Sequence, residues 1–279
     1  MGRIIDTYPA GYTSVSDLAV YMDTTFTSGS TDETAAIRAI VWAEAVIDKY
    51  CGRTFVVTSE TKKYDGRGRT EMPVDDILSL TSVVIDSTTI DSGYYYLYPY
   101  SRYPKRKIKA NGYLFTDGFQ NVEVAGLWGY QESLPTTGTA DSGTTTTLVD
   151  SPLTQVNDWW NGYVLSVTGG TNVGYSRSVS DFVLSTKTIT VAHAFPVAID
   201  ATSVYALGRI PAGVALAANR LAAVYLRSRT SPGNQNILSE SQGDYSVTYG
   251  STLSLDFIDR EAALYLADYV CPGFGGRGL

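Results

Sequence analysis

The stretch from Thr31 to Tyr50 reads TDETAAIRAIVWAEAVIDKY, and its apolar residues recur at the three- and four-residue spacing of a helix with one buried face. A second stretch, from Pro211 to Arg229, reads PAGVALAANRLAAVYLRSR and repeats this spacing. A third such stretch runs from Phe257 to Tyr269. Because no helix can bury such a face alone, we expect the three helices to pack together across the helix-poor segment that separates them.

That intervening segment has the pattern of β-structure. Runs of β-prone residues at 77–85, 94–98 and 122–126 alternate with turns. From Leu134 to Leu207, shorter β-prone runs are separated by Asn and Gly turns, which is typical of a small barrel or sandwich. We therefore predict an α+β fold: N- and C-terminal helices packed as a small bundle with an antiparallel β region, plus an inserted small all-β domain.

These patterns divide the chain into three parts. Residues 1–134 form the first part of the core, 135–207 the inserted all-β domain, and 208–279 the second part of the core with a C-terminal tail. Thr31 is the expected N-cap of the second helix, and Gly52 is its expected end. The glycine-rich tail is expected to stay flexible until a partner orders it. The expected helices lie near 15–22, 31–51, 211–229 and 256–270, and the first sheet covers 54–130.

Composition narrows the classes of function. The 279 residues are 44% hydrophobic and 18% charged and include 21 tyrosines, which suits a protein that buries much of its surface against neighbours. The formal net charge of −7 argues against a general nucleic-acid binder. No apolar run approaches the length of a membrane span, and the N-terminal residues lack the apolar region of a signal peptide. We therefore expect no membrane contact and synthesis in the cytoplasm.

The sequence offers little of the chemistry that an enzyme needs. The only histidine, His193, lies in an apolar β-prone run without a base, acid or metal ligand nearby, so we interpret it as structural. No zinc spacing or calcium loop occurs, and Gly66-Arg67-Gly68 lacks the context of a phosphate-binding loop. Cys51 and Cys271 exclude a disulfide framework and leave one bridge open, with reduced thiols favoured. We predict no catalytic residue, cofactor or metal.

Two groups of basic residues are candidates for contacts with partners. One is a basic run in a β-prone stretch, which is either a solvated hairpin or a contact for an acidic neighbour or for DNA phosphates. The other is a pair one heptad apart on one helix face, which is either exposed surface or half of an intersubunit salt bridge. The run consists of Arg102, Lys105, Arg106, Lys107 and Lys109, and the pair consists of Arg220 and Arg227.

Three blocks of sequence follow one another in a set order. The first is the Ala-rich helix from Ile37 into Tyr50-Cys51-Gly52-Arg53-Thr54-Phe55. The second holds Tyr64-Asp65-Gly66, Pro73, the 77–85 strand and the run from Asn121 to Tyr130. The third holds Ile210-Pro211, an Ala-rich helix, the run from Glu240 to Tyr249 and a closing helix to Tyr269. In order and spacing, these blocks resemble the head–tail connector (adaptor, or head completion) proteins of tailed bacteriophages. The resemblance covers residues 30–130 and 208–270; the segment from about 135 to 207, which shorter adaptors lack, looks like small β modules of other phage structural proteins.

The resemblance implies a structural role in the neck of a virion, reached by assembly in the host cytoplasm. It implies a ring, a dodecamer, that docks beneath the portal protein and leads to the stopper or tail-completion protein. Genomic DNA would pass through the lumen without sequence-specific binding. In relatives the C-terminal tail embraces the portal, and by similarity this tail would order on docking. The corresponding residues are Cys271, Pro272, Gly273, Phe274, Gly275, Gly276, Arg277, Gly278 and Leu279.

Two other functions stay open at this point. A glycan-binding tail or adsorption protein would stack Trp159 or Trp160 on sugar, although side chains of adjacent strand residues point to opposite faces, so we expect at least one in the core. An enzyme such as a small hydrolase would need paired carboxylates in a cleft. The sequence cannot place Asp75, Asp76 or Asp117 together.

Overall fold

The computed structural model describes residues 4–230, 239–242, 245–248 and 259–271. The chain forms two compact units. One unit contains residues 6–52 and 212–279, and the other contains residues 1–5 and 53–211.

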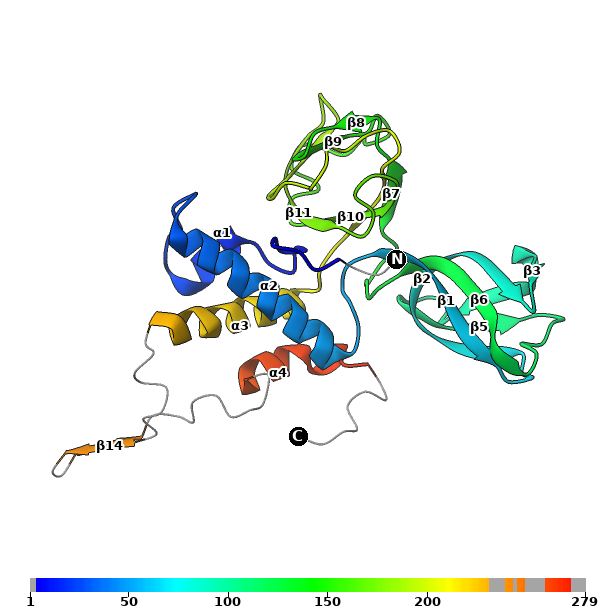
Figure 1. Cartoon of the computed structure of the whole chain (residues 1–279), viewed down its shortest axis with the longest axis horizontal. Helices are drawn as coiled ribbons and strands as arrows, with labels where there is room; N and C mark the ends of the chain where they lie inside the picture. The colour runs from blue at the N-terminus through cyan, green and yellow to red at the C-terminus, as the bar shows by residue number, and fades with distance from the viewer. Residues whose placement is uncertain (1–3, 231–238, 243–244, 249–258, 272–279) are drawn as a thin grey trace. The chain divides into compact units, whose positions relative to one another are not determined.

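The first unit contains the four α-helices of the described residues, and α3 contacts the other three (Figure 1). The apolar face of α2 is buried along its length, as the sequence spacing predicts, and so is that of α3. Ser30, rather than the expected Thr31, is the N-cap of α2, because its Oγ accepts a hydrogen bond from Glu33 N at 3.1 Å. Gly52 ends α2 in the left-handed conformation, as expected. The helices are α1 (Val15–Met22), α2 (Thr31–Cys51), α3 (Ala212–Thr230) and α4 (Arg260–Leu266).

A buried carboxylate attaches the segment before α1 to α2. Glu44 is fully buried, and its two carboxylate oxygens accept hydrogen bonds from the backbone N–H groups of residues 10, 11 and 12, at 2.9, 2.9 and 3.0 Å. Thr13 Oγ1 then donates to Asn219 Oδ1 of α3 at 2.6 Å. The segment thus bridges α2 and α3, and it satisfies a charge that the helix would otherwise bury at high cost.

The second unit contains an antiparallel sheet of six strands in the order β1-β6-β2-β5-β4, with β3 paired to β2 (Figure 1). Buried and half-buried residues alternate along β6, so that Val122, Val124 and Trp128 enter one core. β4 lies at the edge of the sheet, which leaves one side of its backbone without a strand partner in the described residues. The strands are β1 (Thr58–Gly66), β2 (Glu71–Ile85), β3 (Thr88–Ile90), β4 (Tyr95–Tyr98), β5 (Lys105–Ala110) and β6 (Gly118–Trp128).

The same unit contains a seven-stranded antiparallel sheet in the order β7-β13-β10-β11-β12-β9-β8. Only Ala140 and Asp141 separate β7 from β8, so the two ends of this path belong to one stretch of chain and the sheet closes into a barrel (Figure 1). The strands surround one apolar core, which includes Leu148, Phe182 and Ile189. The strands are β7 (Thr136–Thr139), β8 (Ser142–Gly143), β9 (Thr147–Val149), β10 (Val164–Gly169), β11 (Ser176–Val183), β12 (Thr188–Val191) and β13 (Val204–Gly208).

The predicted fold class is wrong. The chain is not an α+β fold built on a bundle of terminal helices; it is mostly β, with antiparallel sheets of six and seven strands. Helical spacing near the two ends of the chain does not predict the fold class. The segment between the terminal helices contains most of the secondary structure as strands, of which β2 alone has 15 residues. The last helix is also shorter than expected: α4 has seven residues, a 3₁₀ turn follows at Ala267–Tyr269, and Phe257 lies outside the described residues.

Two further observations complete the fold. A separate two-stranded sheet pairs β14 (Ser239–Gln242) with β15 (Tyr245–Thr248). In the part of the chain that the structure describes, no helix has both the length and the apolar character needed to cross a bilayer. The barrel strands run from Thr136 to Gly208, but the division of the chain into parts 1–134, 135–207 and 208–279 stays a prediction.

Candidate functional site: a tyrosine surface and a basic hollow on the first sheet

Five exposed tyrosines gather at the β4 edge of the six-stranded sheet. Tyr94 and Tyr113 meet edge to face, with ring centroids 5.2 Å apart. Tyr100 is the most exposed of the set, at 78%. An exposed aromatic cluster of this kind is unusual on an isolated monomer and is typical of an interaction surface. We call Tyr94, Tyr96, Tyr98, Tyr100 and Tyr113 the tyrosine surface.

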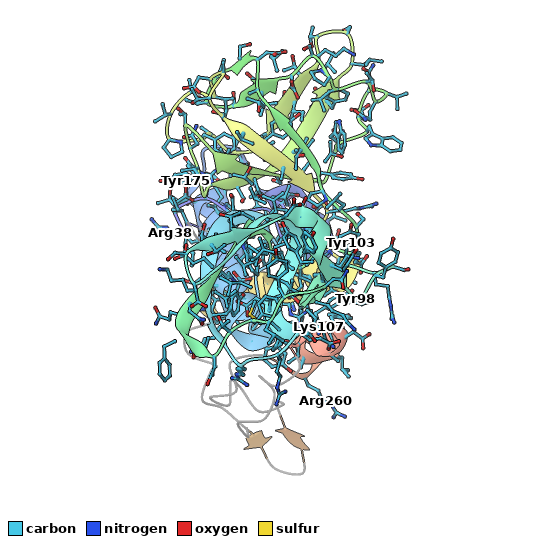
Figure 2. All side chains as sticks on the ribbon, turned by 90° about the vertical axis from the view of Figure 1, so that its right-hand side faces the viewer. Arg38, Tyr98, Tyr103, Lys107, Tyr175 and Arg260 are labelled. Atoms are coloured by element: carbon cyan, nitrogen blue, oxygen red, sulfur yellow. The ribbon has the colours of Figure 1, made fainter. Side chains whose placement is uncertain are left out.

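The loop that carries Tyr100 is held in place by a buried lysine. Lys105 is only 6% exposed, and its Nζ donates hydrogen bonds to the carbonyl oxygens of Pro99 and Tyr100 at 2.8 and 2.6 Å. The same ammonium group lies 4.2 Å from the centre of the Tyr103 ring. Tyr98 and Lys107 pair across β4 and β5, and Figure 2 labels them near Tyr103. Tyrosine side chains on a fixed backbone lose little conformational entropy when they bind a partner, which favours binding.

Most of the predicted basic run makes contacts within the chain. It forms strand β5 of the β4–β5 hairpin and the loop before it; Lys107 and Lys109 are exposed there, whereas Lys105 is buried. Arg106 Nε donates to Asp76 Oδ1 at 2.9 Å, and Lys107 and Lys109 pair with Glu71 at 2.8 and 3.2 Å. These two lysines lower the pKa of Glu71, chiefly through their hydrogen bonds to its carboxylate. Arg102 is exposed in the loop. Within the described residues, three of the five cations of the run are thus held by two carboxylates of the same chain, and Lys105 is held by backbone carbonyl oxygens.

Asp76 also compensates a buried arginine. The Arg53 side chain is 4% exposed and the Asp76 side chain 8%, and Arg53 Nε lies 3.4 Å from Asp76 Oδ2. Within the described residues, the Arg53 guanidinium nitrogens form no hydrogen bond, so Asp76 and the Tyr130 ring, 5.0 Å away, provide its main compensation. Asp75 pairs instead with Lys62, at 2.9 Å, and Asp117 is exposed. Of the three acids considered for a hydrolase, Asp75 and Asp76 thus form ion pairs and Asp117 is exposed.

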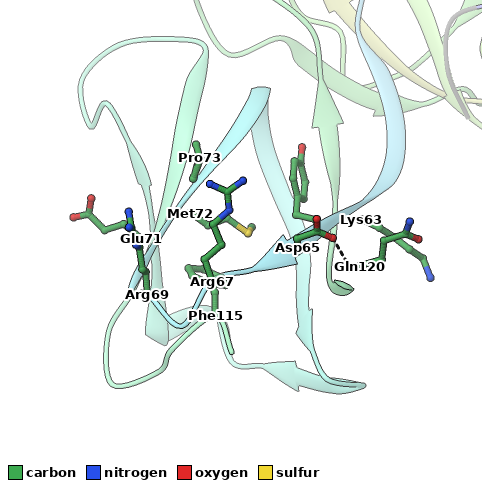
Figure 3. A pocket seen from close by; sticks show the side chains of 10 residues that line it. Lys63, Asp65, Arg67, Arg69, Glu71, Met72, Pro73, Phe115 and Gln120 are labelled. Carbon is green, nitrogen blue, oxygen red and sulfur yellow. Dashed lines mark hydrogen bonds between the residues drawn. The ribbon is translucent and has the colours of Figure 1, made fainter. Parts of the chain in front are cut away.

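A hollow of about 700 Å³ lies beside the loop that joins β1 to β2 (Figure 3). Met72 and Phe115, which are 4% and 2% exposed, form its apolar floor. The guanidinium group of Arg67 extends across the hollow, between the wall with Arg69 and the wall with Lys63 (Figure 3). We call this site the hollow. It is lined by Lys63, Tyr64, Asp65, Arg67, Arg69, Glu71, Met72, Pro73, Phe115 and Gln120.

The loop at the hollow is fixed by its backbone. Gly68 N donates to Phe115 O at 2.7 Å, Phe115 N donates to Arg69 O at 2.8 Å, and Gln120 N donates to Asp65 Oδ1 at 2.8 Å. A Cβ on Gly66 would lie 1.7 Å from Thr116 O, so only glycine fits there. In the sequence, the hollow could have been recognised only from Gly66-Arg67-Gly68-Arg69, in which two arginines flank a glycine of a tight turn.

The hollow carries a small excess of positive charge, since its lining has the cations Lys63, Arg67 and Arg69 against the carboxylates of Asp65 and Glu71. Lys63 pairs with Glu123 at 2.8 Å, and Glu71 is shared by Lys107 and Lys109. Among the described residues, no ion pair reaches Arg67 or Arg69. Burial raises the pKa of Tyr64, so this phenol stays neutral at the wall. The hollow therefore offers two guanidinium groups above an apolar floor, beside the carboxylate of Asp65, which accepts a hydrogen bond from Gln120 N.

The predicted arginine pair on α3 has a partner within the chain. Arg220 Nε donates to Asp259 Oδ2 at 2.7 Å, and Arg220 Nη1 lies 3.3 Å from Glu261 Oε2. Asp259 is the N-cap of α4, so the ion pair attaches α4 to α3. Arg220 thus forms its ion pairs within its own chain, and an intersubunit bridge from Arg220 or Arg227 stays a prediction. Arg227 is exposed and lines a smaller hollow of about 280 Å³ in the helical unit.

The two adjacent tryptophans have different environments. Trp160 is 3% exposed and packs edge to face on Tyr163 in the barrel core, with ring centroids 5.0 Å apart. Trp159 is 54% exposed. A sugar platform made of both rings is therefore excluded, and Trp160 cannot stack on a glycan without unfolding of the barrel.

The other predicted residues do not line the hollow or form part of the tyrosine surface. His193 is half-buried in the turn after β12. Cys51 is buried and Cys271 is half-buried; in the part of the chain that the structure describes neither is in a disulfide, and Cys271 N donates to Cys51 O at 2.8 Å. Residues Pro272 to Leu279 of the predicted tail lie outside the described residues. The described residues contain no cluster of three or more His, Cys, Asp or Glu that could hold a metal ion. No protein-family model matches the chain, and no curated protein sequence matches it.

Proposed function

We propose that the protein is a structural head–tail connector of a tailed bacteriophage. It forms a ring beneath the portal protein, lets the genomic DNA pass and joins the head to the stopper or tail. The observation that carries this proposal is the tyrosine surface, because a rigid, exposed aromatic cluster suits permanent contact with another protein. The order of the connector-like sequence blocks supports the same role.

Charge supports the passage of DNA. The chain has 28 acidic and 21 basic residues, and Arg106, Lys107 and Lys109 are paired with acids of their own subunit. A ring of such subunits would hold a polyanion only weakly, so the duplex could slide. The ring therefore needs no sequence-specific contact with the DNA.

The tail completes the proposed contacts. The backbone N–H of Cys271 donates a hydrogen bond to the carbonyl oxygen of Cys51 in α2, so the residues that follow Cys271 start from a fixed point on the helical unit. In the proposal, Pro272 to Leu279 reach the portal protein from that point. The tyrosine surface lies on the other unit and is assigned to the joint with the stopper or tail.

We expect the double variant Tyr96→Ser, Tyr100→Ser to lower the fraction of DNA-filled heads that gain tails by about tenfold or more, because exposed tyrosines are frequent binding hot spots. In-vitro completion of tail-less heads, counted by electron microscopy, measures this fraction. Val20→Ser, which changes an 82% exposed apolar residue of α1, is the matched control and should leave completion unchanged. Normal completion by the tyrosine variant would contradict the role of this surface.

A further inference from the structure

A turn of the barrel displays an aromatic side chain next to an acid. Val156 and Trp159 are 63% and 54% exposed, and Asp158 lies between them, also exposed. We call Val156, Asp158 and Trp159 the knob. Exposing a tryptophan to water costs free energy because its ring is largely apolar, and tryptophan is enriched at binding hot spots.

The knob is rigid because its neighbours are anchored. Asp158 N donates to Phe182 O of β11 at 2.9 Å, and Leu184 N donates to Asn157 Oδ1 at 2.8 Å. Trp160 fills the barrel core directly behind the turn. Asn161 Nδ2 donates to Asp158 Oδ1 at 3.0 Å, which leaves the other carboxylate oxygen, Oδ2, to face solvent or a partner. The knob is therefore preorganised for binding.

The knob and the hollow carry groups that can bind each other. The knob presents an indole and a carboxylate, whereas the hollow presents an apolar floor and two guanidinium groups without ion pairs in the described residues. Arginine binds carboxylates through two parallel hydrogen bonds, and it also stacks on tryptophan, the best cation–π acceptor. The barrel segment from 135 to 207 has five aspartates against Arg177 and Lys187, so its charge favours approach to a basic site.

We propose that the knob of one copy inserts into the hollow of a neighbouring copy. Trp159 covers Phe115 and Met72, and Asp158 pairs with Arg67 and Arg69. Because the two surfaces differ, the contact is head-to-tail, which is the type of contact that closes into a ring. The inference rests on the proposed function, since the ring is what places a second copy beside the first.

Self-association of the full chain, measured by analytical ultracentrifugation with and without the portal protein, tests the contact. Trp159→Ala, Asp158→Arg and the pair Arg67→Glu, Arg69→Glu should each weaken self-association by about 30-fold. The combined variant Asp158→Arg, Arg67→Glu, Arg69→Glu exchanges the charges of both surfaces and should restore association to within about threefold of the unaltered chain. Val197→Ala, at a 57% exposed apolar position of the barrel, is the control.

Each outcome separates this contact from the wider proposal. Rings that form equally well with the knob and hollow variants overturn the contact and leave the connector role standing. Rings that depend on these residues but never bind the portal protein support the contact and remove the connector role. Failure of the exchanged-charge variant to recover, with thermal melting like that of the unaltered chain, also overturns the contact.

Discussion

Replacing Glu44 with alanine is expected to lower the free energy of unfolding of the helical unit by about 4 kcal/mol. Three backbone N–H groups at residues 10, 11 and 12 would lose their acceptor in a fully buried site. Each buried donor without a partner costs about 1–3 kcal/mol, and partial entry of water reduces the sum. Urea denaturation followed by the circular dichroism of the helices measures the loss.

Two further variants serve as controls for Glu44→Ala. Glu44→Gln keeps one acceptor oxygen and should lose about half as much stability as the alanine variant. Asp32→Ala removes an exposed carboxylate from the first turn of the same helix and should cost about 1 kcal/mol or less. If Glu44→Ala costs no more than Asp32→Ala, the attachment of the N-terminal segment to α2 is not as described.

The second large effect is expected at Asp76. The variant Asp76→Ala leaves Arg53 charged and almost fully buried without a carboxylate, and it also removes the partner of Arg106. Breaking one side of a buried ion pair costs about 3–5 kcal/mol. The loss should appear in urea denaturation of the sheet-containing unit, followed by the fluorescence of Trp128 in the core of the first sheet.

The neighbouring acid provides the control for this variant. Asp75→Ala removes a carboxylate that is 65% exposed and paired with Lys62, so it should cost about 1 kcal/mol or less. The double variant Arg53→Met, Asp76→Leu removes both buried charges and should recover most of the stability. Equal losses for Asp75→Ala and Asp76→Ala would show that Arg53 does not depend on this ion pair.

Local features of the fold were predictable from the sequence. The spacing of Ala36, Ile40 and Ile47 marks the buried face of α2, and Gly52 marks its end, because both follow from helix geometry alone. The fold class was not predictable in this way. It depends on how many strands pair and in which register, and these pairings join residues far apart, such as Thr58 with Trp128.

The candidate site was predictable only in part. The basic run is visible in the sequence, but the ion pairs of its last three cations with Glu71 and Asp76 depend on the pairing of β5 with β2. The hollow depends on contacts of the β1–β2 loop with Phe115, which lies 46 residues after Arg69. Alternation along a strand predicts that one of Trp159 and Trp160 is buried, but both residues lie in a turn, so the burial of Trp160 and the exposure of Trp159 follow from how this turn packs on the barrel.

Electron microscopy of the purified chain mixed with the portal protein tests the connector role most directly. The account predicts rings of this chain stacked coaxially beneath the portal, each around a hole wide enough for duplex DNA. Portal particles that carry no added ring, at concentrations where both proteins are intact and folded, would contradict it.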